Sequence, residues 1–302
     1  MEDLKIFENN LVQKKESYIE KYLEYIDVSE NSSKEYHTGL KMFFEYCVKN
    51  NIKDIQRQDI IGYREYLKQQ GKSANTINLY LTSIKNFFKW LDYEEIYKDI
   101  SQNIKSLPIE STHIRESLNE EQIKELLSNC QNDKESLIIS IAVTTGIRCN
   151  EMCNIRLKDF VMKDNKVCLY VLGKARQGMK TDFVVISDKL LEQIKSYVEN
   201  NNITDYLFTS NSNNSKGKPL STRSMREIVN KIYERANMKT ENLVFHSLRH
   251  SNATLSIKNG VDIREVSQNL RHKSITTTMR YLHDLEMTDN KCSDTISNLL
   301  FA

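Results

Sequence analysis

Side chains that can act on a phosphodiester gather in the last quarter of this sequence. His246, Arg249 and His250 stand in one short stretch, and His272 and Tyr281 follow further along the chain. A guanidinium can hold a phosphate through two parallel hydrogen bonds, imidazoles can add further hydrogen bonds, and a phenol can attack the phosphorus. The same residue types also occur in ordinary polar helical domains, so the cluster by itself leaves both interpretations open.

The composition is typical of a globular protein that is large enough for two domains. Of its 302 residues, 39% are hydrophobic and 28% are charged, which excludes a disordered or fibrous chain. The longest apolar-leaning run, Leu137 to Ile147, is too short to span a bilayer. The chain opens on charged residues without a secretory signal pattern, so we expect a cytoplasmic protein with no membrane partner.

The cysteines and histidines do not form a recognisable metal site. The six cysteines are scattered without a CxxC pair, at positions 47, 130, 149, 153, 168 and 292. Cys149 and Cys153 could share one face of a helix, but no second pair completes a zinc site. His250, one turn after His246, is expected to be a buried structural histidine because no third ligand is apparent. We therefore expect reduced thiols and no metal.

Local charge is more informative than the net charge of +2. The stretch Gly71–Trp90 contains three lysines and no acid, and Lys216–Lys239 contains seven Lys or Arg against two acids. Such patches mark contact with a phosphate backbone, although a basic run on a helix is often only a solvated face. The candidate phosphate contacts, none of which would read sequence, are Lys72, Lys85, Lys89, Arg223 and Arg226.

Four amphipathic helices are expected in the first third of the chain. Apolar residues recur at intervals of three and four residues in Tyr18–Tyr25, Lys34–Asn50, Arg57–Gln70 and Asn75–Leu91. Gly71 should end the third helix, and Ser73 should cap the fourth. These helices predict a compact bundle, in which the aromatic stripe of the fourth helix belongs to the core rather than to a base-stacking surface.

Helical periodicity lapses around Pro108, where we expect a linker over residues 108–116. This linker would separate a first domain, residues 1–107, from a second domain, residues 117–302. The second domain should open on a helix that is capped by Asn119, with a glutamine three residues later as its capping partner.

The second domain mixes helices with a short β segment. A buried helix over Leu137–Thr145 should stop at Gly146, and two β-rich runs, Lys166–Val171 and Asp182–Ile186, flank a turn that contains Lys174. Helices resume from Asp188, Thr222, Ser247 and Asp262. The predicted fold class is mainly α, with an N-terminal helical bundle and an α+β domain that holds a small antiparallel hairpin or sheet.

Several segments of the second domain carry a family resemblance. Thr144–Met152 resembles an arginine motif with an acidic residue three positions on, and Lys174 matches a hairpin lysine. Residues 246–254 resemble a His-x-x-Arg motif, and residues 270–281 resemble a final histidine followed by a tyrosine. Together they resemble the catalytic domain of the tyrosine recombinases, the phage-integrase family that includes the Xer-type recombinases. The first domain resembles the SAM-like core-binding domain of that family, so the likeness covers nearly the whole chain.

One residue departs from the family pattern. Arg271 stands where the family usually has a glycine before its histidine, His272. We expect this arginine to alter the start of a helix without loss of activity.

Two arginines would stabilise the charge of the reaction. Tyrosine has a pKa near 10, which makes it a poor nucleophile at neutral pH. A unit charge about 4 Å away contributes on the order of 4 kcal/mol at an effective dielectric constant near 20. We assign Arg148 and Arg249 to the non-bridging oxygens, where their contacts would strengthen in the transition state. The alternative is that both are surface salt-bridge partners.

The proton transfers define the remaining roles. Lys174 would protonate the leaving 5′ oxygen as a general acid. His246 and His272 would hydrogen-bond the phosphate, and His246 could also accept the proton of Tyr281, the nucleophile. Glu151, one turn after the first arginine, would orient an arginine or a histidine. A solvated Lys174 and an ordinary surface Glu151 are the alternatives.

The resemblance implies a site-specific DNA recombinase. Tyr281 would form a 3′-phosphotyrosyl link and release a 5′-hydroxyl, so no ATP, cofactor or metal is needed and no small-molecule substrate is expected. By family analogy, four protomers would join two double-stranded recombination sites and pass through a Holliday junction, and the free protein would be a monomer or weak dimer. The tail from Thr288 to Leu300 would dock on a neighbouring protomer or pack on its own.

Other functions fit part of the pattern. A type IB topoisomerase would use similar chemistry to relax supercoils, and a DNA-binding regulator could keep the fold without the chemistry. Within the recombinases, Xer-like dimer resolution, plasmid resolution, DNA inversion and mobile-element integration stay open.

Overall fold

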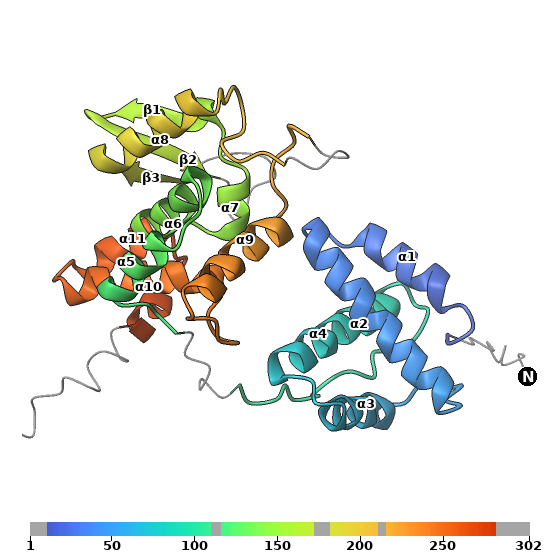
Figure 1. Ribbon diagram of the computed structural model, residues 1–302. Helices are drawn as coiled ribbons and strands as arrows, with labels where there is room; N and C mark the ends of the chain where they lie inside the picture. The colour runs from blue at the N-terminus through green and yellow to red at the C-terminus, as the bar shows by residue number, and fades with distance from the viewer. Residues whose placement is uncertain (1–10, 110–115, 172–181, 211–215, 282–302) are drawn as a thin grey trace, which may run out of the picture. The chain divides into compact units, whose positions relative to one another are not determined.

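The computed structural model describes residues 11–109, 116–171, 182–210 and 216–281 (Figure 1). The chain divides into two compact units, Met1–His113 and Ile114–Ala302. Helices dominate both units, and the second also holds a small antiparallel sheet, so the predicted fold class is confirmed. No helix in these ranges has the length and apolar character that a membrane span needs.

The described part of the first unit is a bundle of four helices. They are α1 (Lys15–Tyr25), α2 (Glu30–Lys49), α3 (Arg57–Gln69) and α4 (Ala74–Tyr93). Helix α2 starts before the predicted Lys34, because the hydroxyl of Ser29 accepts a hydrogen bond from the amide of Ser32 and caps the helix there. Ser73 caps α4 in the same way, as predicted, and Gly71 has a left-handed conformation just after α3.

Aromatic side chains form the core of this bundle, chiefly where α2 packs on α4. Phe43 and Phe44 of α2 and Phe87 and Phe88 of α4 are fully buried, and the Phe44 and Phe87 rings meet edge to face. Burial of one such side chain contributes about 1.5–3 kcal/mol to folding. Trp90 is buried as well, so the aromatic stripe of α4 is core, as the sequence predicted.

The second unit contains the remaining named helices. They are α5 (Glu120–Ser128), α6 (Asp133–Thr145), α7 (Cys149–Cys153), α8 (Asp188–Asn200), α9 (Thr222–Arg235), α10 (Phe245–Lys258) and α11 (Ile263–Asn269), with a 3-10 turn at Leu157–Asp159. Asn119 and Gln122 form the predicted capping box at α5. Helix α10 begins two residues before the predicted Ser247, because the hydroxyl of that serine accepts a hydrogen bond from the amide of Val244. His246 therefore lies on the helix.

The described strands form a three-stranded antiparallel sheet in the order β1-β2-β3. The strands are β1 (Phe160–Lys163), β2 (Lys166–Val171) and β3 (Asp182–Ile186). The sequence predicted β2 and β3 but missed β1, which is short and mostly exposed. Asp164 and Asn165 connect β1 to β2 with positive φ at both positions, the conformation that a tight two-residue hairpin requires.

Helix α6 is the central element of the second unit. It contacts α10, α8, α9 and β3, and Figure 1 shows it between the sheet and α10. Ile138, Ile139 and Ile141 of α6 are fully buried. Because the helix is fixed on several sides, the segment that leaves its C-terminus at Gly146 is fixed as well. That segment leads directly to Arg148.

Candidate active site

Arg148 is positioned by a glycine turn and by a carboxylate. Gly146 ends α6 with φ +61°, and a Cβ there would lie 2.5 Å from Leu270 Cδ2. Only glycine suits both this conformation and this close approach. Arg148 then caps α7. Its amide and its Nη1 donate to the two carboxylate oxygens of Glu151, at 2.9 Å and 2.6 Å, and its Nη2 donates to the main-chain oxygen of Arg271 at 3.1 Å.

Arg249 is held inside the protein by main-chain oxygens. It lies on α10 with only 1% of its surface exposed, and its guanidinium donates to the carbonyl oxygens of Gly146 and Leu270. Burial, together with the charges of Arg148 and Arg271, lowers the pKa of Arg249 to about 9. The group is still cationic at neutral pH, so it is a buried positive charge that a bound anion would stabilise.

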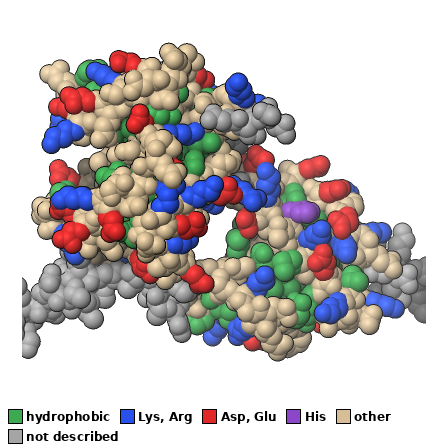
Figure 2. Space-filling view, viewed as in Figure 1, with side chains coloured by type: hydrophobic (Ala, Val, Ile, Leu, Met, Phe, Trp, Pro, Cys, Tyr) green, Lys and Arg blue, Asp and Glu red, His purple; other side chains and the backbone are tan. Residues whose placement is uncertain are grey.

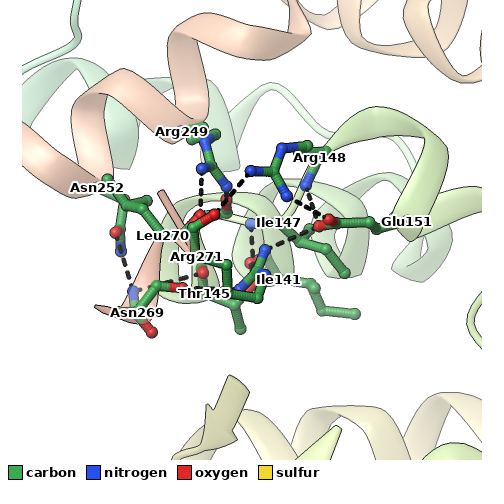
Figure 3. Close-up of polar contacts among 11 residues, drawn as sticks. Ile141, Thr145, Ile147, Arg148, Glu151, Arg249, Asn252, Asn269, Leu270 and Arg271 are labelled. Atoms are coloured by element: carbon green, nitrogen blue, oxygen red, sulfur yellow. Dashed lines mark hydrogen bonds and ion pairs between the residues drawn. The ribbon is translucent and has the colours of Figure 1, made fainter. Parts of the chain in front are cut away.

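Glu151 is the carboxylate shared by two arginines (Figure 3). Arg271 Nη2 donates to Glu151 Oε2 at 2.8 Å, while Arg148 Nη1 bonds Oε1. Burial alone would raise the pKa of Glu151, but Arg271 and Arg148 outweigh it and hold that pKa below its usual value. The carboxylate is therefore ionised at neutral pH. It contacts arginines, one of the two partner types that the sequence suggested, and its role in orienting Arg148 stays a prediction.

Arg271 does not lie at a helix start, which corrects our expectation. It lies in the turn after α11 with φ +54°, the left-handed conformation that a glycine would adopt freely and that costs another residue roughly 1–2 kcal/mol. Its side chain is buried, donates to the main-chain oxygen of Asn269 at 2.7 Å and pairs with Glu151. Its Nε is buried without a hydrogen-bond partner among the described residues. The next helical stretch begins only at residue 276.

Tyr281 lies among imidazole rings. Its ring centroid is 5.1 Å from that of His250 and 6.4 Å from that of His272, to which it is nearly parallel. His272 Nδ1 is 2.8 Å from the hydroxyl of Thr278. Burial, with the charges of Arg249 and Arg148, lowers the pKa of His272 to about 4, so this ring is neutral at neutral pH. It can then still donate one hydrogen bond to a phosphate.

His250 is closer to the site than the sequence suggested. The centroid of its ring lies 5.1 Å from that of Tyr281 and also 5.1 Å from that of His246. We expected His250 to be a buried structural residue, but it is only half-buried and adjoins the tyrosine. Its spacing of four residues from His246 on α10 was the signal that could have identified it, since both then project from the same face of the helix.

The other candidates are distributed differently. Lys174 lies outside the described residues. Lys72 and Lys89 are exposed, whereas the ammonium of Lys85 donates to the main-chain oxygen of Ile104. The exposed residues Arg223 and Arg226 both lie on α9, and Arg223 pairs with Glu227 at 2.9 Å. Figure 2 shows Lys and Arg side chains gathered in a band on the visible face of the second unit, with acidic side chains to either side.

The described part of the chain offers no group of three or more His, Cys, Asp or Glu that could hold a metal ion. Cys149 and Cys153 share one face of α7, and both are free thiols. A hydrogen bond with Cys153 lowers the pKa of the Cys149 thiol against the effect of burial, and Arg226 adds to the lowering. The described cationic side chains of the site are guanidiniums, which suit an oxyanion with paired oxygens.

Comparisons with known proteins agree with this geometry. The phage integrase family matches residues 116–287, and the N-terminal SAM-like domain of phage integrases matches residues 16–95. The chain therefore belongs to the phage integrase family. It is a tyrosine recombinase of the Xer type, an enzyme that transfers DNA strands.

Individual relatives extend over most of the chain. The tyrosine recombinase XerC of Anoxybacillus flavithermus is 28% identical over 284 residues, which is 87% of this chain and 91% of that protein. XerD of Staphylococcus aureus is 28% identical over 287 residues, 89% of this chain and 94% of that protein. XerA of Pyrococcus horikoshii is 29% identical over 263 residues, 86% of this chain and 85% of that protein.

Solved structures share the fold. The XerH site-specific recombinase bound to its difH substrate, in a post-cleavage complex, has a TM-score of 0.71 at 21% identity and covers 97% of this chain and 98% of its own. A lambda integrase dimer bound to a core site has a TM-score of 0.67 at 17% identity and covers 87% of this chain and 96% of its own. These comparisons do not favour DNA relaxation or a catalytically silent regulator.

Proposed function

We propose that this enzyme cuts and rejoins DNA at a specific site through a covalent link to Tyr281. The observation that carries the proposal is that Tyr281 adjoins the rings of His250 and His272. Close to them, one turn holds both Arg148 and Arg249 through its main-chain oxygens. The charge of Arg249 helps lower the pKa of His272. A nucleophile, hydrogen-bond donors and two guanidiniums are what attack on a phosphodiester requires.

The proposed steps balance in atoms and charge. The phenolic oxygen of Tyr281 attacks the scissile phosphorus, and its proton passes to an imidazole of the His246–His250 pair. The bond from phosphorus to the 5′ oxygen breaks, and Lys174 protonates that oxygen. Arg148 and the other phosphate ligands hold the non-bridging oxygens. A second 5′-hydroxyl then attacks the phosphotyrosyl phosphorus and gives its proton to Lys174. The bond from phosphorus to the phenolic oxygen breaks, and Tyr281 regains its proton from the imidazole, so no ATP is consumed.

The phosphate ligands divide into two kinds. Arg148 and Arg249 would supply charge, while the hydrogen bonds to Glu151 and to main-chain oxygens hold their guanidiniums in place. His272 is neutral at neutral pH and supplies a hydrogen bond without charge, and His246 is proposed as the second imidazole donor. Glu151 does not touch the phosphate, because both of its oxygens are engaged by arginines.

DNA binding and assembly are part of the proposal. The first unit would bind the duplex as a core-binding domain, with Lys72 and Lys89 on phosphates, and Arg223 and Arg226 would do the same from the second unit. Lys85 would support this surface through its bond to Ile104. Four protomers would synapse two duplexes and form a Holliday junction. Its DNA substrate implies a cytoplasmic enzyme.

Trapping on a nicked suicide substrate tests the chemistry. Cleavage beside the nick releases a short fragment, so religation fails and the covalent complex accumulates. The wild type should form a complex that survives denaturation, and Tyr281→Phe should form none while binding the same DNA in a mobility-shift assay. A covalent complex with Tyr281→Phe would contradict the assignment of the nucleophile. Mapping of binding across the host genome would supply the recombination site for this experiment.

A substrate with sulfur at the 5′ bridging position tests Lys174. A thiolate leaves without a proton, so loss of the general acid should not slow cleavage of this substrate. Lys174→Ala should cleave the oxygen substrate at least ~100-fold more slowly than wild type, as is typical for a lost general acid, and should cleave the sulfur substrate nearly as fast. Equal loss on both substrates would exclude Lys174 as the general acid.

A further inference from the structure

The turn that follows α11 holds both phosphate arginines. The carbonyl oxygen of Leu270 accepts from Arg249, and the next carbonyl oxygen, that of Arg271, accepts from Arg148 at 3.1 Å. Two consecutive peptide groups thus set the spacing of two guanidiniums that come from distant parts of the sequence. The conformation of this one turn is therefore a condition for the geometry of the site.

The side chain of Arg271 returns to the same group of residues. Its Nη1 donates to the main-chain oxygen of Asn269 at 2.7 Å, and its Nη2 donates to Glu151 Oε2 at 2.8 Å. Figure 3 shows Arg271 and Arg148 reaching Glu151 together. The side chains of Arg271 and Glu151 are 6% and 4% exposed, so water screens their interaction little.

The second arginine at Glu151 changes the net charge of the group. A carboxylate that pairs with Arg148 alone would orient that guanidinium but would also cancel most of its charge. With Arg271 on Oε2, the two arginines and the carboxylate keep one net positive charge, and Arg249 adds another. The field of these guanidiniums is felt nearby, because Arg249, Arg148 and Arg271 all contribute to the lowered pKa of His272.

We infer that Arg271 is a positioning residue for strand cleavage, acting through Glu151. Its guanidinium neutralises the Glu151 carboxylate. Glu151 can then orient Arg148 while the positive charge of Arg148 still acts on the scissile phosphate. The backbone of Arg271 also fixes the turn that holds both arginines. A merely structural arginine at this place would stabilise the fold and leave the rate of cleavage unchanged. The inference rests on the proposed function, since it concerns the cleavage step.

Three substitutions separate the charge of Arg271 from its structural effects. Arg271→Gly suits the left-handed backbone and removes the side chain, Arg271→Met keeps much of the bulk without the charge, and Arg271→Lys keeps a cation. Arg264→Ala removes an exposed arginine of α11, the helix that precedes the turn, and is the matched control. Each protein is measured for thermal stability, for DNA affinity, and for the single-turnover rate of covalent complex formation at saturating DNA.

The expected result is a loss of rate at nearly unchanged DNA affinity. Arg271→Gly and Arg271→Met should cleave roughly tenfold more slowly, the effect of weakening one charge-assisted contact in the transition state. Arg271→Lys should recover part of that loss, and Arg264→Ala should match the wild type. The acid limb of the rate profile should move to higher pH in Arg271→Met, because Glu151 loses the cation that most lowers its pKa.

A double-mutant cycle tests the route through Glu151. In a Glu151→Gln background no carboxylate remains to be neutralised, so Arg271→Met should cost less rate there than in the wild type. Equal costs in both backgrounds would overturn the inference. So would an Arg271→Gly enzyme that cleaves at the wild-type rate with an unchanged pH profile, whether or not its stability falls.

The wild type and Tyr281→Phe serve as controls that distinguish failure of the Arg271 inference from failure of the proposed function. If the wild type forms no covalent complex, or Tyr281→Phe forms one, the proposed function fails before Arg271 is at issue. If the wild type cleaves, Tyr281→Phe does not, and the Arg271 variants match the wild type, then only the role of Arg271 is refuted.

Discussion

The buried guanidinium of Arg249 donates a hydrogen bond to the main-chain oxygen of Gly146, which lies 103 residues earlier in the chain. Gly146 is the last residue before the segment that carries Arg148. The contact therefore ties the second arginine to the backbone that positions the first. A shift of that backbone would move both guanidiniums. The positions of the two positive charges therefore depend on the backbone of Gly146.

Gly146→Ala should damage both stability and cleavage. The new Cβ would lie 2.5 Å from Leu270 Cδ2 and 3.0 Å from Asn252 Oδ1, at φ +61°. Strain and displacement together should cost about 2–4 kcal/mol of unfolding free energy, measured by urea denaturation. Gly260→Ala is the matched control, because its φ is +80° and nothing lies within 4 Å of its Cβ position. It should cost only about 1 kcal/mol and leave the cleavage rate unchanged. Equal losses in the two variants would show that the close approach to Leu270 is unimportant.

Local patterns in the sequence predicted most of the elements. Asn119, with its capping glutamine, and Ser73 cap the starts of helices, and Gly146 ends one. These capping roles depend on residues close in sequence, so they could be predicted without knowledge of the fold. Strand β1 was not predicted, because a short strand that is exposed on both faces has no alternation of apolar and polar residues. The Asp164-Asn165 pair, two residue types that tolerate the positive φ of a two-residue hairpin turn, was the available indication in the sequence.

The contacts of Arg271 could not be predicted from the sequence. Its motif marked it only as a departure from glycine. What its side chain does depends on Glu151, 120 residues earlier, and on the packing of α11 that brings the two together. The same holds for His250, whose contact with Tyr281 requires the turn after α11 and the next helical stretch to return to α10. Long-range contacts of this kind are properties of the fold.

A small anion should stabilise the free protein through Arg249. Among the described residues, Arg148 and Arg271 pair with Glu151, and burial together with the charges of these two arginines lowers the pKa of Arg249. Millimolar inorganic phosphate, at an ionic strength matched with chloride, should raise the melting temperature. At ten times the dissociation constant the gain is about 1.4 kcal/mol, or roughly 3–5 °C for a unit of this size. Arg249→Met should lose the gain. An equal shift in this variant would indicate that phosphate acts elsewhere.

Stability should fall as the pH falls from about 6.5 toward 4. The pKa of His272 is about 4 in the folded protein and 6.5 as its ordinary value, so the unfolded state binds more protons within this window. Glu151 acts in the same direction at lower pH, because its folded pKa is held below its usual value. His272→Gln should therefore show a shallower loss of stability over this range in urea denaturation. The exposed His37→Gln is the control and should keep the wild-type slope. If both variants keep that slope, His272 is not held in its neutral form by the fold.

Lysines of the first unit should separate into two kinds when DNA binding is measured against salt. Lys72 and Lys89 are exposed, so Lys72→Ala and Lys89→Ala should each weaken binding and reduce the slope of log K against log salt by about 1, as expected for one lost phosphate contact. Lys85→Ala should instead lower the melting temperature, because the Lys85 ammonium holds the main-chain oxygen of Ile104. Its salt slope should stay near that of the wild type. A reduced slope at normal stability would make Lys85 a direct phosphate contact, and unchanged slopes for Lys72→Ala and Lys89→Ala would place the DNA on another face of this unit.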